Sequence, residues 1–292
     1  MPPDARRRIL AAAAALCLWG ASPFPAGCGQ DSPPPPPADP GPELPPIGEV
    51  APSEAVRIDE EKLIEVPPPP RREPLRWDFS PGRRYAYEVS QRLNQVTVIA
   101  SGTGRTVTRS EDRNGGYFEF TAAGGATAQV RVKIQTRSSL IDGRPAPPEA
   151  IERQPPTKFE CRIGEDGVPT SGRKVSGASD PLIFFDALLA LQEGERKSAD
   201  GAVRTKLTGY FKVERYECAR LESEFEFSPG FSSGRTVLRG RCVAYFALRE
   251  RRFVRAEASI AQAIRTKARD EKGAWITRAT DLETAIRLRP LE

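Results

Sequence analysis

Apolar and polar residues alternate along two long stretches of the chain. In the first stretch the apolar side chains recur at every second position, as in Tyr85, Tyr87, Val89, Phe118, Phe120, Val130, Val132 and Ile134. A two-residue period is typical of β-strands that bury one face and expose the other to water. The pattern predicts strands across about 76–140 and, with the same rhythm, across 207–290.

Short turn signals separate these segments. They include Ser101–Gly104, Arg113–Gly116, Gly124-Gly125, Asp142-Gly143 and Asp270–Gly273. Long strands joined by short turns favour an antiparallel meander, and a long meander twists and curls. We therefore expect a mainly β fold, a long antiparallel curved sheet in the form of a meander or half-barrel. The pattern leaves open whether the two stretches form one sheet or two subdomains.

One segment breaks the two-residue period. Asp180 and Pro181 suit the N-cap and first position of a helix, and the apolar residues that follow have helical spacing. We expect a largely buried helix at about 181–192, lying across the concave face of the sheet. Phe184, Phe185 and Leu188 would then either line a cavity for a hydrophobic ligand or fill an ordinary core.

Residues 1–27 have the three parts of an export signal. Arg6, Arg7 and Arg8 provide a basic start, an apolar run follows, and small residues and prolines complete the segment. The apolar run is too short to span a membrane, so it is expected to direct export and then to be removed.

The end of this segment, Ala26-Gly27-Cys28, resembles the lipobox of bacterial lipoproteins. In that family the cysteine is lipidated and becomes the new N-terminus. The resemblance implies that Cys28 carries several acyl chains, which anchor a protein stably where one chain is marginal. Pro25 departs from the family pattern, which normally has an aliphatic residue there. The alternative is simple secretion after cleavage near Ala21 or Ala26.

A proline-rich stretch follows the lipobox. Fifteen of the 29 prolines lie between Asp31 and Pro74. Proline fixes φ and lacks a backbone donor, so this stretch favours extended polyproline II over sheet or helix. We expect residues 28–74 to be a lipid-anchored disordered linker that carries a globular domain, 75–292, away from the membrane. The interlude at 53–66 is expected to form either a helical turn or an added edge strand.

Three cysteines, Cys161, Cys218 and Cys242, remain after export into an oxidising compartment. If the segments on either side of Gly230 pair as a hairpin, Cys218 and Cys242 lie opposite each other and can form a disulfide. Cys218 has the parity opposite to the apolar face that Leu221 marks, so other pairings, including Cys161–Cys242, stay open.

Composition narrows the chemistry. The chain has no histidine, which excludes Ser-His-Asp and Cys-His nucleophiles and His-ligated zinc. It also lacks the CxxC spacing of thiolate metal sites, so we expect no catalytic residue, metal or cofactor. A glycosidase-like acid/base pair would have to come from carboxylates such as Glu217, Glu222, Glu224 and Glu226. The last three alternate with apolar neighbours and fit a solvated outer face.

The net charge of +5 falls to about +3 when Arg6, Arg7, Arg8 and Asp4 leave with the signal. This mild excess lacks the aromatic interleaving of nucleic-acid binders, so nucleic acid is not an expected partner.

These observations favour a non-enzymatic lipoprotein of the cell envelope, outer-membrane or periplasm-facing, with a binding or scaffolding domain on a proline-rich stalk. Its expected partners are the membrane, through the lipid anchor, and a hydrophobic ligand or an envelope protein. In outline the architecture resembles the half-barrels of periplasmic lipoprotein carriers, an analogy without a supporting motif. The alternative function is a carboxylate-based hydrolase acting on cell-wall glycan.

Overall fold

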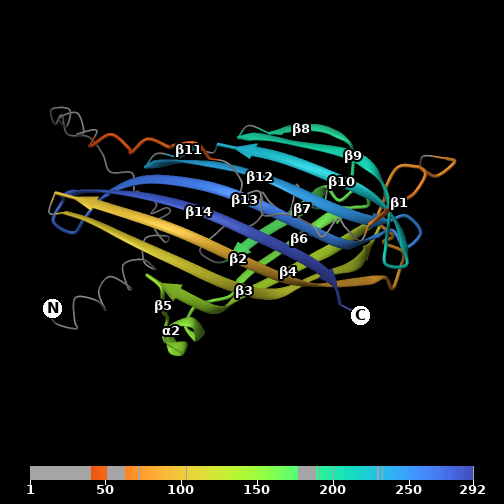
Figure 1. Ribbon diagram of the computed structural model, residues 1–292, viewed down its shortest axis with the longest axis horizontal. Coiled ribbons are helices and arrows are strands. Elements are labelled where there is room, and N and C mark those ends of the chain that lie inside the picture. The colour runs from red at the N-terminus through yellow and green to blue at the C-terminus, as the bar shows by residue number, and fades with distance from the viewer. Residues whose placement is uncertain are drawn as a thin grey trace, which may run out of the picture. The chain divides into compact units, whose positions relative to one another are not determined.

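The computed structural model describes residues 41–50, 63–71, 73–102, 104–176, 189, 191–198, 200–228, 230–231 and 233–291. The chain divides into two compact units, Met1–Gly41 and Pro42–Glu292. Within the second unit the described strands form one 14-stranded sheet, and every strand pairing is antiparallel (Figure 1). The predicted export signal and the lipidation residue Cys28 lie outside the described residues.

The elements occur in the following order along the chain. They are β1 (Ile64–Glu65), β2 (Arg84–Ser101), β3 (Gly104–Gly124), β4 (Thr127–Ile141), β5 (Arg144–Pro145), α2 (Pro148–Glu152), β6 (Thr157–Gly164), β7 (Pro169–Ser176), β8 (Gly194–Ser198), β9 (Gly201–Val213), β10 (Tyr216–Phe227), β11 (Gly230–Phe231), β12 (Gly234–Ala247), β13 (Arg252–Arg269) and β14 (Trp275–Pro290).

The strand order shows that the two predicted β-rich stretches belong to one sheet. The main path runs β1-β9-β10-β12-β13-β14-β2-β3-β4-β6-β7. The joint between the stretches is β14 against β2, which pair from Ile276↔Ser101 to Pro290↔Tyr87. In Figure 1 the dark blue β14 lies directly beside the gold β2. The predicted mainly β class and the long antiparallel curved sheet are confirmed, and the sheet is not closed on itself.

One face of the sheet forms a single hydrophobic core. Side chains from β9 at one end of the strand order and from β6 at the other belong to the same buried cluster, so this face is the inner side of a curled sheet. Trp77, in the segment before β2, is fully buried at its centre. Its ring centroid lies 4.8–5.8 Å from those of Phe79, Tyr85, Phe120, Phe246 and Phe253.

The predicted turn at Arg113–Gly116 is wrong, because these residues lie inside β3. A register shift between Arg113 and Asn114 accommodates them in the ladder with β4. At Gly116 a Cβ atom would lie 1.8 Å from the carbonyl oxygen of Lys133. Glycine is therefore required here because two strands approach each other closely. In the sequence, a glycine with this role cannot be told apart from a glycine in a turn.

The predicted helix at 181–192 falls mostly outside the described residues. Of its residues the structure describes Leu189, Leu191 and Gln192, and both leucines are buried in the core cluster. The short helix α2 was not predicted from the sequence. Within the described residues, no helix is long and apolar enough to cross a membrane.

Part of the stretch predicted to be a disordered linker packs on the sheet. Pro42–Val50 lies against β12 and β13, where Val50 and Ile47 contact Ala261 and Ala263. Further on, β1 pairs with β9, so the last residues of the interlude at 53–66 form the edge strand that was one of its two alternatives, while residues 53–62 lie outside the described part of the chain. Prolines exclude these segments from the middle of a sheet, but they leave backbone carbonyls free to accept hydrogen bonds.

We predict that Trp77→Ala lowers the free energy of unfolding by about 3–5 kcal/mol, because it leaves a large cavity among five aromatic rings. Urea unfolding followed by far-UV circular dichroism measures the change. The matched control is Trp275→Ala, since Trp275 stacks with Arg269 at the surface and its loss should cost roughly 1 kcal/mol or less. Equal losses for the two variants would contradict a central role for Trp77.

Candidate binding cleft

A cleft of about 840 Å³ opens where the two edges of the curled sheet approach each other. Leu207 and Tyr210 of β9 line one side, and Gly164–Asp166 at the β6–β7 turn line the other. The rest of the lining comes from the segments 73–76 and 191–193 and from Ala126 and Thr170. The described lining combines apolar side chains (Leu75, Leu191, Leu207), one tyrosine (Tyr210), four carboxylates (Glu73, Glu165, Asp166, Glu193) and one cation (Arg76).

The β6–β7 turn holds its side of the cleft through main-chain hydrogen bonds. The backbone N–H of Trp77 donates to the carbonyl oxygen of Glu165 at 2.8 Å, and that of Leu191 donates to Asp166 at 3.1 Å. Asp166 Oδ1 accepts from the backbone N–H of Val168 at 3.0 Å, which stabilises the turn. The buried Trp77 therefore connects the aromatic core directly to the cleft.

A β-bulge shapes the opposite side. The pairing of β9 with β10 shifts register between Arg220 and Leu221, so that Thr208 is left without an opposite residue. An extra residue reverses which face the following side chains occupy. Leu207 before the bulge and Tyr210 after it consequently both line the cleft, whereas Phe211 packs in a separate cluster with Val213 and Cys218.

A smaller hollow of about 300 Å³ continues from the cleft along β9. It shares Glu193, Leu207 and Tyr210 with the cleft and adds Pro68, Thr208 and Gly209. Glu193 Oε1 accepts a hydrogen bond from the backbone N–H of Leu207 at 3.1 Å, which joins the 191–193 segment to β9.

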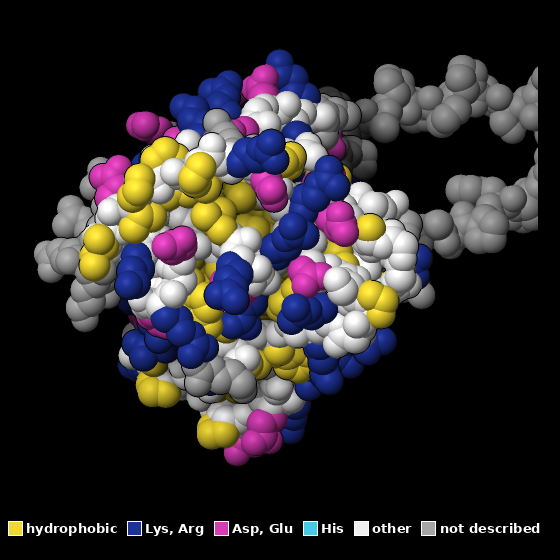
Figure 2. Space-filling view, turned by 90° about the vertical axis from the view of Figure 1, so that its right-hand side faces the viewer, with side chains coloured by type: hydrophobic (Ala, Val, Ile, Leu, Met, Phe, Trp, Pro, Cys, Tyr) yellow, Lys and Arg dark blue, Asp and Glu magenta, His cyan; other side chains and the backbone are white. Residues whose placement is uncertain are grey.

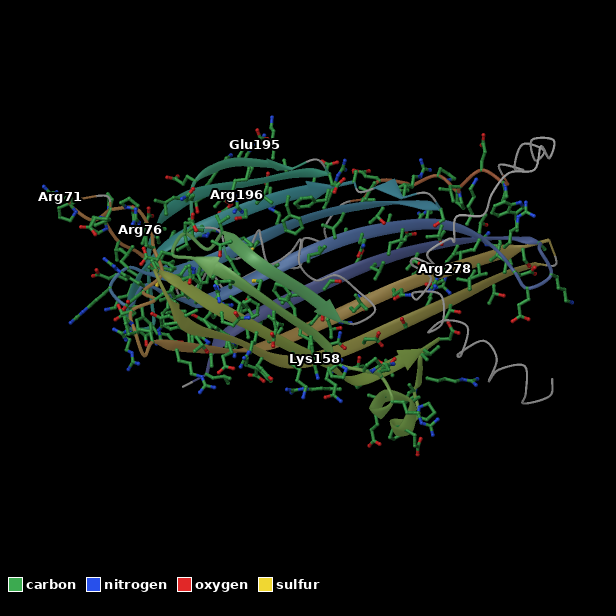
Figure 3. The ribbon with its side chains drawn as sticks, turned by 180° about the vertical axis from the view of Figure 1, so that it is seen from behind. Arg71, Arg76, Lys158, Glu195, Arg196 and Arg278 are labelled. Carbon is green, nitrogen blue, oxygen red and sulfur yellow. The ribbon has the colours of Figure 1, made fainter. Side chains whose placement is uncertain are left out.

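Acidic groups outnumber basic ones in the described lining of the cleft. The one described cation, Arg76, lies 3.7 Å from Glu165, which balances one of the four carboxylates. Figure 2 views this end of the molecule and shows an apolar patch bordered by acidic and basic side chains. Figure 3 places Arg76 at one end of the sheet and Arg278 at the opposite end. The arrangement suits a ligand with an apolar body and a positive charge.

The sequence did not indicate this cleft. The sequence feature that relates to the cleft is a break in the alternation along β9. Val203, Thr205 and Leu207 occupy odd positions, whereas Tyr210 occupies an even one. Such a break in alternation marks a bulge, and bulges occur often beside functional sites. Of the predicted cavity residues, Phe184, Phe185 and Leu188 lie outside the described part of the chain.

The predicted disulfide between Cys218 and Cys242 is wrong. Both are buried free thiols, and Cys218 lies opposite Ala247 while Cys242 lies opposite Ser223. Cys242 lies opposite Ser223, so the two cysteines are five positions apart along the strand direction. This separation corresponds to about 16 Å. They also belong to different clusters, Cys242 on the inner face and Cys218 on the outer face.

The physical reason for this error is the position of the turn between β10 and β12. Phe231 pairs with Gly234, so the chain reverses after Phe231 and not near Gly230. When the centre of a hairpin moves by two or three residues along the chain, the residue opposite any given position changes by five. The alternation of apolar residues placed Leu221 on the buried face and Cys218 on the opposite face, which argued against the disulfide. The structure agrees, because Leu221 is buried in the inner core.

The carboxylates considered for hydrolysis lie elsewhere. Glu222, Glu224 and Glu226 are ion-paired with arginines on β10 and β12, at N–O distances of 2.8–3.7 Å. They do not line the cleft or the adjoining hollow. In the part of the chain that the structure describes, no group of Cys, Asp and Glu is arranged to hold a metal ion.

Comparison with known proteins adds little. No protein-family model matches the chain, and no curated protein matches it. A crystal structure of a DUF1329 family protein from Desulfovibrio piger is similar at 13% identity, over 70% of this chain and 85% of that one, with a TM-score of 0.14. At that TM-score the similarity carries no argument about fold or function.

We predict that Cys218 and Cys242 do not react with iodoacetamide in the folded protein at pH 8 and react fully in urea without a reductant. Burial raises the pKa of the Cys218 thiol from its ordinary 9.0 to about 12, and burial also raises the pKa of Cys242. Burial keeps the Cys218 thiol neutral in the folded protein, whereas the same thiol in the unfolded chain ionises above pH 9. The contribution of Cys218 to the free energy of unfolding is therefore complete below pH 9 and is lost as the pH rises from 9 to 12. Intact mass spectrometry counts the alkylated thiols. If Cys218 and Cys242 reacted only after reduction, the two residues would be joined by a disulfide and this prediction would be contradicted.

Proposed function

We propose that this chain is a non-enzymatic binding protein of the bacterial cell envelope, exported by residues 1–27 and anchored through lipid on Cys28. The observation that carries the proposal is the open cleft between the two edges of the sheet. A sheet that stays open at this place leaves apolar surface and polar groups accessible together, which is the usual character of a ligand site.

Most of the inner face is an ordinary core rather than a ligand cavity. Trp77 and the rings around it fill the space beside the cleft, and Leu189 and Leu191 are buried with them. A ligand is therefore assigned to the cleft itself, with its apolar part against Leu75, Leu191 and Leu207.

The charges of the cleft favour a cationic ligand. With Glu165 balanced by Arg76, the lining also carries the carboxylates of Glu73 and Asp166, while Glu193 is engaged with β9. Excess negative charge in a partly desolvated cleft attracts cations and repels anions of the same shape. We assign to this site a small amphiphile or an envelope peptide that combines an apolar segment with an amine or guanidinium group.

We predict that octyltrimethylammonium binds the cleft at least 10-fold more tightly than octyl sulfate, measured by isothermal titration calorimetry below the micellar concentrations. Glu73→Gln should weaken binding of the cation roughly 2- to 5-fold, from about 0.5–1 kcal/mol for a partly exposed charge. Glu88→Gln, on a residue outside the cleft, is the matched control. Tighter binding of the sulfate, or equal effects of the two variants, would exclude this site for cations.

We also predict that Cys28→Ala moves the protein from the membrane fraction to the soluble fraction of the envelope. Without the thiol no acyl chain can be attached, and the tether alone has no apolar segment that holds a bilayer. The matched control is Cys17→Ala, which lies inside the predicted export signal and should leave the protein membrane-bound. Membrane retention of the Cys28 variant would contradict lipid anchoring at this residue.

A further inference from the structure

The outer face of the sheet carries a built site for part of the chain's own proline-rich tether. The docked segment, Pro42–Val50, runs over β12 and β13, and four cationic side chains donate hydrogen bonds to its backbone carbonyls. The donor–acceptor pairs are Arg235 Nη2 to Pro45 (3.1 Å), Arg239 Nη1 to Val50 (3.3 Å), Arg265 Nε to Pro46 (3.3 Å) and Lys267 Nζ to Pro42 (3.3 Å).

The sheet also provides an apolar floor for the docked segment. Ala261 and Ala263 are buried on the outer face of β13, and Val50 is only 8% exposed against them. Ile47 and Val237 pack at the border of this cluster. Small side chains on two successive outward positions allow a second segment to approach the strand closely. Cationic donors above an apolar floor suit a proline-rich segment, whose carbonyls have few N–H partners of their own.

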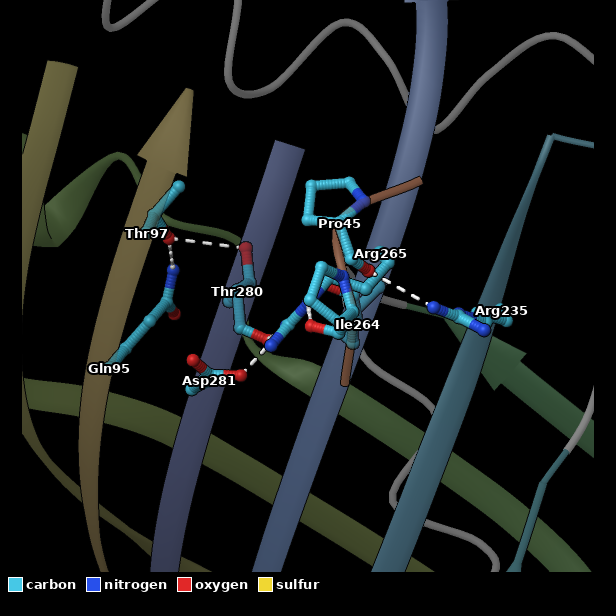
Figure 4. Close-up of polar contacts among 9 residues, drawn as sticks. Pro45, Gln95, Thr97, Arg235, Ile264, Arg265, Thr280 and Asp281 are labelled. Atoms are coloured by element: carbon cyan, nitrogen blue, oxygen red, sulfur yellow. Dashed lines mark hydrogen bonds and ion pairs between the residues drawn. The ribbon is translucent and has the colours of Figure 1, made fainter. Parts of the chain in front are cut away.

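One of the four donors is also held by the sheet itself. Arg265 is 5% exposed, and its Nη1 donates to Asp281 Oδ1 at 2.7 Å and to the carbonyls of Ile264 and Thr280 at 3.1 and 3.2 Å (Figure 4). Figure 4 also shows Arg235 reaching Pro45 from the neighbouring strand. A buried guanidinium held on one side by Asp281 presents Nε to Pro46 without a search for the right rotamer.

The docked segment begins at the end of the sheet that is remote from the cleft. Pro42 contacts Lys267, near the end of β13 and next to the residue that pairs with Arg278. The cleft lies at the other end of β13, where the Trp77 and Phe253 ring centroids are 5.0 Å apart. From Phe253 to Lys267 the rise of a strand amounts to about 45 Å. Arg76 and Arg278 mark these two ends in Figure 3.

A second attachment lies beside the cleft itself. β1 pairs with β9, and the backbone N–H of Val66 donates to the carbonyl oxygen of Tyr210, a cleft residue, at 3.0 Å. If the docked segment leaves the outer face, the tether therefore departs from the sheet next to Tyr210.

We infer that docking of Pro42–Val50 decides which end of the domain faces the anchoring surface. With the segment docked, the tether leaves the sheet at the Lys267 end, which is remote from the cleft. With the segment released, the tether starts beside the cleft. From the length of a fully extended chain, the reach from Cys28 is at most about 50 Å in the docked state and about 130 Å in the released state. The membrane aspect of this inference rests on the proposed anchor at Cys28.

Glutamyl endopeptidase tests the docking without any membrane, because it cleaves after Glu49 in the docked segment. In the chain that begins at residue 28, we expect cleavage at Glu49 to be at least 10-fold faster in the triple variant R235S/R239S/K267S than in the wild type. Arg241→Ser, which removes an outer-face arginine of β12 that pairs with Glu224, is the matched control and should leave the rate unchanged.

Two further measurements separate docking from loss of the fold. Cleavage after the exposed Glu271 in the β13–β14 turn should be equal in all variants, which shows that the sheet is intact. Ile47→Asp changes only the docked segment and should also accelerate cleavage at Glu49. Cleavage of the wild type and the triple variant at the same rate would overturn the docking site.

Orientation is measured on vesicles. The chain has no histidine, so a hexahistidine tag placed before residue 29 attaches it at one point to nickel-chelating lipid. A donor dye is carried on Glu271→Cys at the remote end or on Arg215→Cys in the β9–β10 turn, and the acceptor is a rhodamine lipid. We expect greater energy transfer from position 271 than from 215 in the wild type, and loss or reversal of this order in the triple variant.

The same order of transfer in both proteins, or greater transfer from position 215 in the wild type, would overturn the orientation. Because the tag replaces the natural anchor, this result is independent of lipidation at Cys28. Failure of the anchor proposal is detected separately, by membrane retention of the Cys28 variant.

Discussion

The burial of Trp77 is the interaction on which the rest of the structure depends. The sheet is long and open, so its apolar inner face cannot be covered by the strands alone. Trp77 fills the space between strands that lie far apart in the strand order, with contacts from Phe120 on β3 to Phe246 on β12. Because its backbone N–H also donates to Glu165, the same residue joins the core to one side of the cleft. The same side chain therefore connects the core of the curled sheet to the cleft.

The two faces of the sheet are covered in different ways. On the inner face, aromatic side chains from both halves of the chain exclude water. On the outer face, small residues such as Ala261 and Ala263 would be exposed to water if the proline-rich segment did not cover them. Prolines cannot extend the sheet, yet their carbonyls accept hydrogen bonds from Arg235 and Arg265. A segment whose composition is typical of a free tether is therefore held by side chains that the domain supplies.

Alternation predicted the larger elements well, because the parity of a strand is a local property. The strands around Tyr85 and Val130, and the inward position of Leu221, follow directly from it. The errors arose where a local pattern has two structural meanings. Gly116 looks like part of a turn but permits close packing of β3 against β4, and the apparent turn at Gly230 precedes the true reversal. The displaced turn changed the register and with it the expected partner of Cys218.

The fold class and the antiparallel arrangement could be read from the amino-acid sequence alone, because both follow from the side-chain period and from short turns rich in glycine. Three-dimensional structure was needed to show the pairing of β14 with β2, the meeting of Tyr210 with Glu165 around one cleft, and the docking of Pro42–Val50 on β12 and β13. Each of these joins residues that lie between 45 and about 220 positions apart in the chain. Contacts of that kind depend on strand order and register, which no local pattern encodes.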